Sequence, residues 1–171
     1  MRRPWRSRIC WAFACLTTAT ASPALAQVPH PELEPLARLV GGSWHLGADS
    51  YHIFAWGVGG QSVTTKSYFV LPEGDKLVSE GAFFYHPGEG TLKGFAVAID
   101  MGLDLFEYTI EARGDTLVMD LEVFGPAAGE TPLRETWVFT DDQHYVWTLL
   151  QQNDEGWQRW MGGTYERRPG N

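Results

Sequence analysis

The stretch 103–124, LDLFEYTIEARGDTLVMDLEVF, consists of two runs of strand-forming residues joined by Arg113-Gly114-Asp115. Every second residue of the later run is apolar: Leu117, Met119, Leu121 and Val123. A period of two is typical of a strand with one buried face, and Gly beside Asp is typical of a tight turn. The stretch therefore predicts an antiparallel hairpin.

Short strands and turns rich in Gly, Asn and Asp continue along most of the chain. Strands are expected at Ser43–Leu46, Tyr51–Trp56, Gln61–Val70, Lys76–Tyr85, Thr91–Ile99, Leu103–Glu111, Thr116–Phe124, Leu133–Thr140, Tyr145–Gln151 and Trp157–Arg167. A meander of this length closes into a barrel or folds into a sandwich, because an open sheet would expose two edges. The predicted fold class is all-β, a single antiparallel meander barrel of about ten strands preceded by a short N-terminal helix.

The first 26 residues have the pattern of a secretory signal peptide. Four arginines precede an uncharged, mostly apolar run from Ile9 to Ala21, and Ala24-Leu25-Ala26 forms a small-x-small cleavage site before Gln27. The predicted organisation is a signal peptide over 1–26 and one barrel domain over 27–171. We expect export to the periplasm or the extracellular space and a soluble protein after cleavage near Ala26-Gln27.

Removal of this leader changes the composition that bears on function. It takes away four of the 13 basic residues and none of the 21 acidic ones, which leaves 145 residues with a net charge of −12. Such an acidic chain is a poor partner for nucleic acid, and no later apolar run is long enough to span a membrane. Both cysteines, Cys10 and Cys15, lie in the leader, which excludes disulfides and thiol chemistry in the mature protein.

Gly42-Ser43-Trp44 opens the first strand after the short helix. It resembles the Gly-x-Trp signature of lipocalins, in which the Trp closes one end of the barrel and a basic residue of the last strand packs over it. The resemblance implies that Gly42, Trp44 and Arg167 form a structural signature, with Arg168 as the alternative partner of the Trp.

From about residue 33 to 168, the chain resembles an uncharacterised family of bacterial exported proteins with a calycin-like barrel. The shared motifs are Leu36 to Trp44, Gly59-Gly60, Phe84-Tyr85-His86-Pro87, Gly156-Trp157 and Tyr165-Glu166-Arg167. This resemblance implies a calycin-like (lipocalin-type) fold and no particular activity.

A weaker similarity links the chain to nitrobindin-like haem-binding barrels, which have ten strands and a similar Gly-x-Trp. Those proteins bind iron through a histidine of a late strand, whereas Trp157–Arg167 contains none and His144 is the only late histidine. We therefore expect no cofactor, haem included. We also expect no metal site, because no two histidines have metal-ligand spacing.

Charged residues on apolar faces suggest where a ligand would bind. Glu135 alternates with Trp137 and Phe139, and Arg159 alternates with Trp157, Met161 and Tyr165. A charge in a dry interior costs several kcal/mol unless it is paired, so a Glu135–Arg159 pair across the barrel would serve to orient a carboxylate or carbonyl ligand. The alternative is that one or both faces point outward and the charges are solvated. The candidate ligand-binding residues are Glu135, Trp137, Arg159, Tyr165 and His144.

The mature chain keeps 20 aromatic residues, enough to line an apolar pocket. The predicted function is binding of a small hydrophobic or amphipathic ligand in the barrel interior. The alternatives are a small barrel enzyme of the cyclase or decarboxylase type that uses interior Glu, Arg and Tyr groups, and a solid-cored structural protein of the envelope. No catalytic residue is assigned, since the Gly-x-Ser-x-Gly motif is absent. The sequence leaves the oligomeric state open.

Overall fold

The computed structural model describes residues 28–99 and 102–169. The predicted signal peptide and its cleavage site lie outside these residues. The strands are β1 Ser43–Leu46, β2 Ser50–Trp56, β3 Ser62–Leu71, β4 Gly74–His86, β5 Thr91–Ala98, β6 Leu105–Arg113, β7 Thr116–Phe124, β8 Leu133–Phe139, β9 His144–Asn153 and β10 Gly156–Arg168. Three short helices accompany them: η1 Pro31–Leu33, α1 Glu34–Ala37 and η2 Val58–Gly60.

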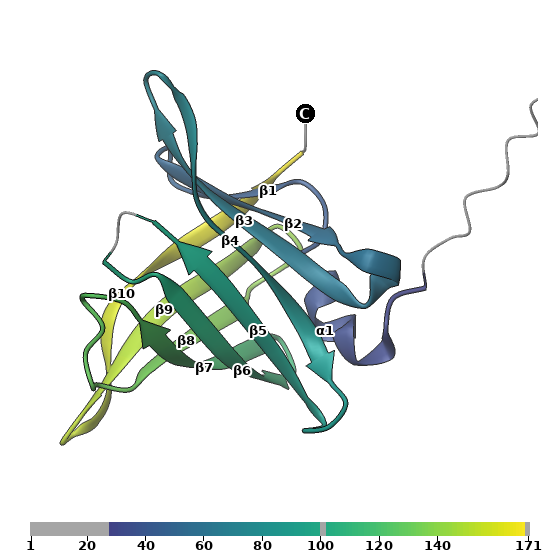
Figure 1. Ribbon diagram of the computed structural model, residues 1–171. Helices are drawn as coiled ribbons and strands as arrows, with labels where there is room; N and C mark the ends of the chain where they lie inside the picture. The colour runs from purple at the N-terminus through teal and green to yellow at the C-terminus, as the bar shows by residue number, and fades with distance from the viewer. Residues whose placement is uncertain (1–27, 100–101, 170–171) are drawn as a thin grey trace, which may run out of the picture.

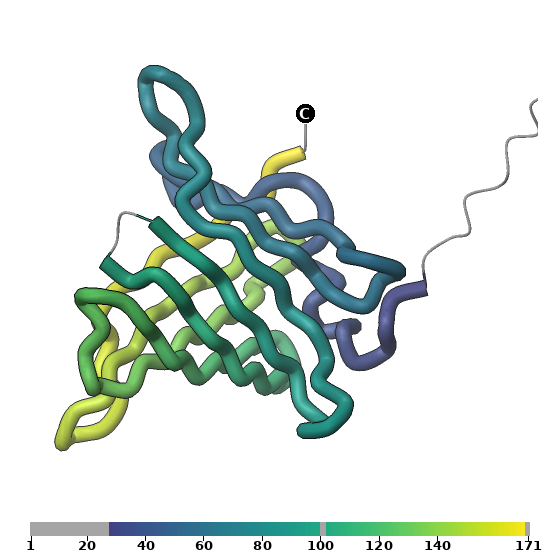
Figure 2. The backbone as a smooth tube through the Cα atoms, viewed as in Figure 1, coloured from purple at the N-terminus to yellow at the C-terminus, as the bar shows by residue number. Residues whose placement is uncertain are grey.

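The ten strands form one closed antiparallel barrel in which each strand pairs with its neighbours in the sequence (Figure 1). Closure comes from β1, which pairs with β2 on one side and with β10 on the other. The tube view shows the strands running diagonally around this barrel (Figure 2). The predicted all-β meander barrel of ten strands, with a short helix before the first strand, is thus confirmed.

The two ends of the barrel differ. The short helices η1 and α1 lie at one end, and the β3–β4 hairpin projects beyond the opposite rim (Figure 1). Leu33, Leu36 and Leu39, from η1 and the segment around α1, are at most 1% exposed and belong to the main hydrophobic core. Apolar residues spaced three apart place their side chains on one face of a short helix, so this segment closes its end of the barrel.

Trp44 is the central residue of this closed end. Its side chain is fully buried, and its indole Nε1 donates a 2.8 Å hydrogen bond to the carbonyl oxygen of Leu39. The guanidinium of Arg167 lies 4.5 Å from the centroid of the indole ring and donates a hydrogen bond to the carbonyl oxygen of Arg38. Arg167, and not Arg168, therefore packs over Trp44. The buried tryptophan joins β1, β10 and the helical segment.

Gly42 has a positive φ of 71°, and a Cβ added to it would collide with the carbonyl oxygen of Arg168 on β10. Replacing Gly42 with Ala is expected to lower the free energy of unfolding by about 2–3 kcal/mol, because it combines a left-handed backbone with a backbone clash. Gly41→Ala is the matched control, since Gly41 also has a positive φ, of 93°, but has no atom within 4 Å of an added Cβ. Urea unfolding of both variants measures the difference, and equal losses would show that the clash has no energetic effect.

A β-bulge in β10 corrects the predicted face of that strand. The register against β9 shifts between Arg159 and Met161, so Arg159 lies opposite Leu150 whereas Met161 lies opposite Leu149. Because one extra residue reverses the alternation of side chains, Trp157 and Arg159 do not share a face with Tyr165. Met161 and Tyr165 share a face, but the expectation that Trp157 and Arg159 lie on that face too was wrong.

A helix with the length and hydropathy to cross a membrane is not found among residues 28–99 and 102–169.

Candidate functional site: the barrel interior

Alternate residues of each strand point into the barrel. On β8 these are Leu133, Glu135, Trp137 and Phe139, and on β9 their cross-strand partners are Gln151, Leu149, Trp147 and Tyr145. The other interior residues with large side chains include Trp44, His52, Phe54, Val63, Phe83, Tyr108, Ile110, Leu117, Met119, Leu121 and Tyr165. Of the two orientations that the sequence left open for β8, the structure has the one with Glu135 and Trp137 inside.

Exposure changes along the barrel interior. Near the helical end, Trp44, Tyr145, Phe54 and Leu117 are at most 2% exposed. Further from that end, toward the rim formed by the β5–β6, β7–β8 and β9–β10 connections, several residues with inward side chains are only partly buried: Phe106, Tyr108, Glu135, Trp147 and Leu149. Burial is therefore most complete next to α1, whereas the other half combines buried residues, such as Met119, with partly exposed ones.

Glu135 lies in the more accessible half. The indole Nε1 of Trp137 donates a 2.9 Å hydrogen bond to its Oε2, and the side chain of Trp147 also hydrogen-bonds to the carboxylate. Burial raises the pKa of Glu135, and the two tryptophan hydrogen bonds oppose that shift because they stabilise the charged form. The carboxylate is thus enclosed by protein and held by two neutral donors.

Three tyrosines surround this carboxylate. Burial is the main cause that raises the pKa values of Tyr108, Tyr145 and Tyr165, and the nearby charge of Glu135 contributes at all three, after Tyr165 in the case of Tyr145. Trp137, Tyr145 and Tyr165 form a continuous stack, with ring centroids 5.2 Å apart in the first pair and 4.8 Å in the second. The carboxylate therefore sits in an aromatic environment whose hydroxyl groups are uncharged at neutral pH.

His52 extends this stack across the barrel. Its Nε2 lies 3.3 Å from the hydroxyl of Tyr165, and the two ring centroids are 4.8 Å apart. Burial lowers the pKa of His52 to about 4, so the imidazole is neutral at neutral pH. Within the described part of the chain, neither the Nδ1 of His52 nor the hydroxyl of Tyr145 has a hydrogen-bond partner. The site thus contains polar atoms that the surrounding protein leaves unsatisfied.

The structure brings together three of the five predicted ligand-binding residues. Glu135, Trp137 and Tyr165 meet inside the barrel. Arg159 points outward, because its partner Leu150 lies opposite Arg134, which pairs with Asp120 on the outer surface.

His144 also lies on the outside of the barrel. Its Nδ1 is 2.9 Å from Oδ1 of Asp141, in the turn that precedes β9. The predicted Glu135–Arg159 pair does not form, and the set of Glu135, Arg159 and Tyr165 considered for an enzyme is not assembled in the interior.

Sequence reasoning did not select His52, Tyr108, Tyr145 and Trp147 for the site. The alternation of His52 with Phe54 and Trp56 was an available signal for an inward histidine. Both faces of β9 are rich in apolar residues, so periodicity alone could not show that Tyr145 and Trp147 point inward.

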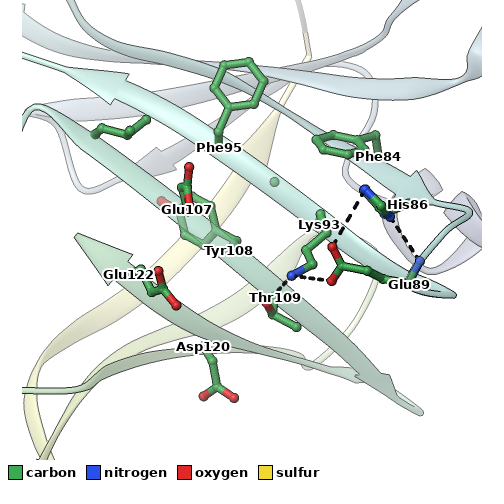
Figure 3. Close-up of a pocket in the computed structure, with 12 residues that line it drawn as sticks. Phe84, His86, Glu89, Lys93, Phe95, Glu107, Tyr108, Thr109, Asp120 and Glu122 are labelled. Atoms are coloured by element: carbon green, nitrogen blue, oxygen red, sulfur yellow. Dashed lines mark hydrogen bonds and ion pairs between the residues drawn. The ribbon is translucent and has the colours of Figure 1, made fainter. Parts of the chain in front are cut away.

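A separate groove of about 530 Å³ lies on the outer face of β4–β7 (Figure 3). Lys93 crosses it, with its Nζ 2.9 Å from Oε2 of Glu89 and 3.1 Å from Oγ1 of Thr109. Glu107 and Glu122 face each other across β6 and β7 in the same groove. The groove is open to solvent and its ion pair is half-exposed, so these charges are hydrated and create a weaker field than Glu135 does in the interior.

No cluster of three or more His, Cys, Asp or Glu residues suited to a metal ion occurs in the described ranges 28–99 and 102–169.

The geometry defines the chain as a ten-stranded antiparallel barrel with a mixed aromatic and polar interior. Among solved structures, it is similar to the crystal structure of Rv2717c from M. tuberculosis, with a TM-score of 0.53 and 15% sequence identity. The match covers 82% of this chain and 99% of that chain, and at this identity it shows the fold alone. No family model matches the sequence, and neither does any curated protein.

Proposed function

We propose that this protein is an exported barrel that binds a small hydrophobic or amphipathic molecule in its interior. The observation that carries the proposal is that Glu135 is an acid inside the barrel and yet belongs to a group of partly exposed residues. Burial dominates the pKa of this carboxylate, yet Glu135 and its neighbours Tyr108, Trp147 and Leu149 keep accessible surface. A site of this kind, mostly aromatic with a few convergent polar groups, is typical of ligand-binding pockets.

The contrast between the two halves of the barrel favours binding over a purely structural role. A solid-cored protein would bury its inward side chains evenly, whereas here full burial is concentrated near Trp44 and the helical segment. Buried polar atoms without partners, such as the hydroxyl of Tyr145, are disfavoured in a core whose only task is stability.

The test compares two adjacent leucines of β9 that point in opposite directions. Leu149 packs against the interior core, and Leu150 lies opposite the outward Arg134. With a neutral hydrophobic dye such as Nile red as the probe, Leu149→Trp is expected to weaken binding at least about tenfold, because the larger ring fills the accessible half. Leu150→Trp is the control, and its affinity for the dye should equal that of the wild type.

Fluorescence titration measures both affinities, and mass spectrometry of the natively purified protein shows whether a small molecule accompanies it. Binding in the interior would be contradicted if the wild type did not bind the dye, or if the two tryptophan variants bound it with equal affinity.

A further inference from the structure

The charge of the barrel interior indicates which kind of ligand it favours. The interior residues that line the accessible half include one ionisable acid, Glu135, together with Tyr108, Trp147, Phe106 and Leu149. The nearest arginine at the interior, Arg167, is separated from them by Trp44, since its guanidinium lies over the indole and hydrogen-bonds to the backbone of Arg38. Among residues 28–99 and 102–169, no cationic side chain is therefore paired with the carboxylate.

An anionic ligand such as a fatty acid does not suit this arrangement. Its carboxylate would lie beside Glu135 in a region of low dielectric, where like charges repel strongly. Arg159, the residue that would have supplied the counter-charge, points away from the interior. The outward position of Arg159 thus removes the basis for carboxylate recognition.

The neighbours of Glu135 are suited to a positive charge. Trp137 and Trp147 hold the carboxylate through their indole N–H groups, and the partly exposed residues Trp147 and Tyr108 supply aromatic rings near it. Aromatic faces attract organic cations, and the attraction grows when both groups are removed from water. The net charge of −12 expected for the mature chain also raises the local concentration of cations.

We propose that the barrel interior binds an organic cation, an ammonium group on an apolar body, with the ammonium against Glu135 and the rings of Trp147 and Tyr108. This inference rests on the interior-binding function proposed above and adds the charge of the ligand. The apolar body of the ligand lies along Phe106, Leu149 and the other apolar side chains toward the rim.

The experiment uses three probes with the same ten-carbon chain: decyltrimethylammonium, decanol and decanoate. Each competes with Nile red for the mature protein at about 0.15 M salt, which screens charges on the outer surface. The cation is expected to displace the dye at a concentration at least about tenfold below that of decanol, and decanoate is expected to be the weakest competitor. Decanol or decanoate competing as well as the cation would overturn the inference.

Two variants separate the interior charge from the charge of the surface. Glu135→Gln keeps a hydrogen-bond acceptor for the indoles but removes the charge, so the preference for the cation over decanol should fall to within about twofold. Glu122→Gln removes the same charge from the outer groove, where Glu122 faces Glu107, and should keep the full preference (Figure 3). An equal loss in both variants would assign the preference to surface charge and contradict the proposal.

A measurement on the wild type covers the case in which Glu135→Gln does not fold. As the pH is lowered from neutral toward, but not to, the lowered pKa of His52, protonation of Glu135, whose pKa is raised by burial, should weaken binding of decyltrimethylammonium and leave that of decanol unchanged. The other titratable groups that face this site are Tyr108, Tyr145, Tyr165 and His52, and all four are uncharged in this range. A pH-independent ratio of the two affinities would contradict a role for Glu135. If none of the three probes displaces the dye, the interior-binding function itself fails, which is a distinct result from loss of charge preference.

Discussion

Replacing Trp44 with Ala is expected to lower the free energy of unfolding by about 3–5 kcal/mol, a large part of the stability of a typical domain. The indole is fully buried, donates a hydrogen bond to Leu39, and packs against Tyr145 with ring centroids 4.9 Å apart. Its removal leaves a cavity at the closed end and frees the guanidinium of Arg167 from its aromatic contact. Urea unfolding followed by circular dichroism measures the loss.

Trp157→Ala is the matched control for this prediction. Trp157 is also in the barrel wall, but it lies on the outer face, where the guanidinium of Arg134 is 4.4 Å from its ring centroid. Its replacement is expected to cost about 1 kcal/mol or less, because a partly exposed cation–π contact on the outer face is weak and no interior cavity forms. Similar losses in the two variants would show that Trp44 does not have the central packing role at the closed end.

The contribution of His52 to the free energy of unfolding is expected to fall by about 3 kcal/mol as the pH drops from about 6.5 to about 4, because the imidazole becomes protonated. The pKa of His52 is lowered to about 4 in the folded state by burial, whereas a histidine in an unfolded chain has a pKa near its usual 6.5. The unfolded state therefore binds the proton first. The contribution of the neutral imidazole to stability is fully present above the unfolded pKa and is lost as the pH falls toward the folded pKa.

The effect of His52 is isolated by the difference between the wild type and His52→Gln. Glu135 acts in the opposite direction, because its raised pKa makes stability fall as the pH rises through its titration, and this contribution is common to both proteins. His144→Gln, which alters an outer-face histidine beside Asp141, is the control and should keep the acid-induced loss. Urea unfolding at several pH values tests this, and an unchanged slope in His52→Gln would show that another group causes the loss.

Local patterns predicted the fold because the information needed for it is local. The turn at Arg113-Gly114-Asp115 and the alternation from Leu117 to Val123 define a hairpin without reference to the rest of the chain. A succession of such hairpins leaves only a few topologies, of which the barrel closes its edges through β1 and β10. The role of Gly42 and Trp44 at the closed end was expected only from the resemblance of Gly42-Ser43-Trp44 to the lipocalin signature.

The candidate site was predictable only in part, because the face of a strand depends on register. On β8 the alternation is regular, so the sequence predicted that Glu135 and Trp137 share a face but left open whether that face points inward. On β10 the bulge between Arg159 and Met161 reversed the face of every residue before it, and no local sequence signal indicated it. The residues around Glu135 come from strands distant in the sequence, such as Tyr108 on β6 and Tyr165 on β10.

The sequence by itself determined the ten strands, their turns, the antiparallel meander and the residues of the closed end, because these depend on backbone conformation and on the period of apolar side chains. Only the tertiary structure decided which charges enter the barrel. The bulge places Arg159 outside, and the closure of the sheet gathers Glu135, His52 and three tyrosines inside. The physical reason is that side-chain direction has a period of two residues along a strand, so one inserted residue exchanges inside for outside. That single change removed Arg159 as a partner for Glu135 in the part of the barrel that the structure describes.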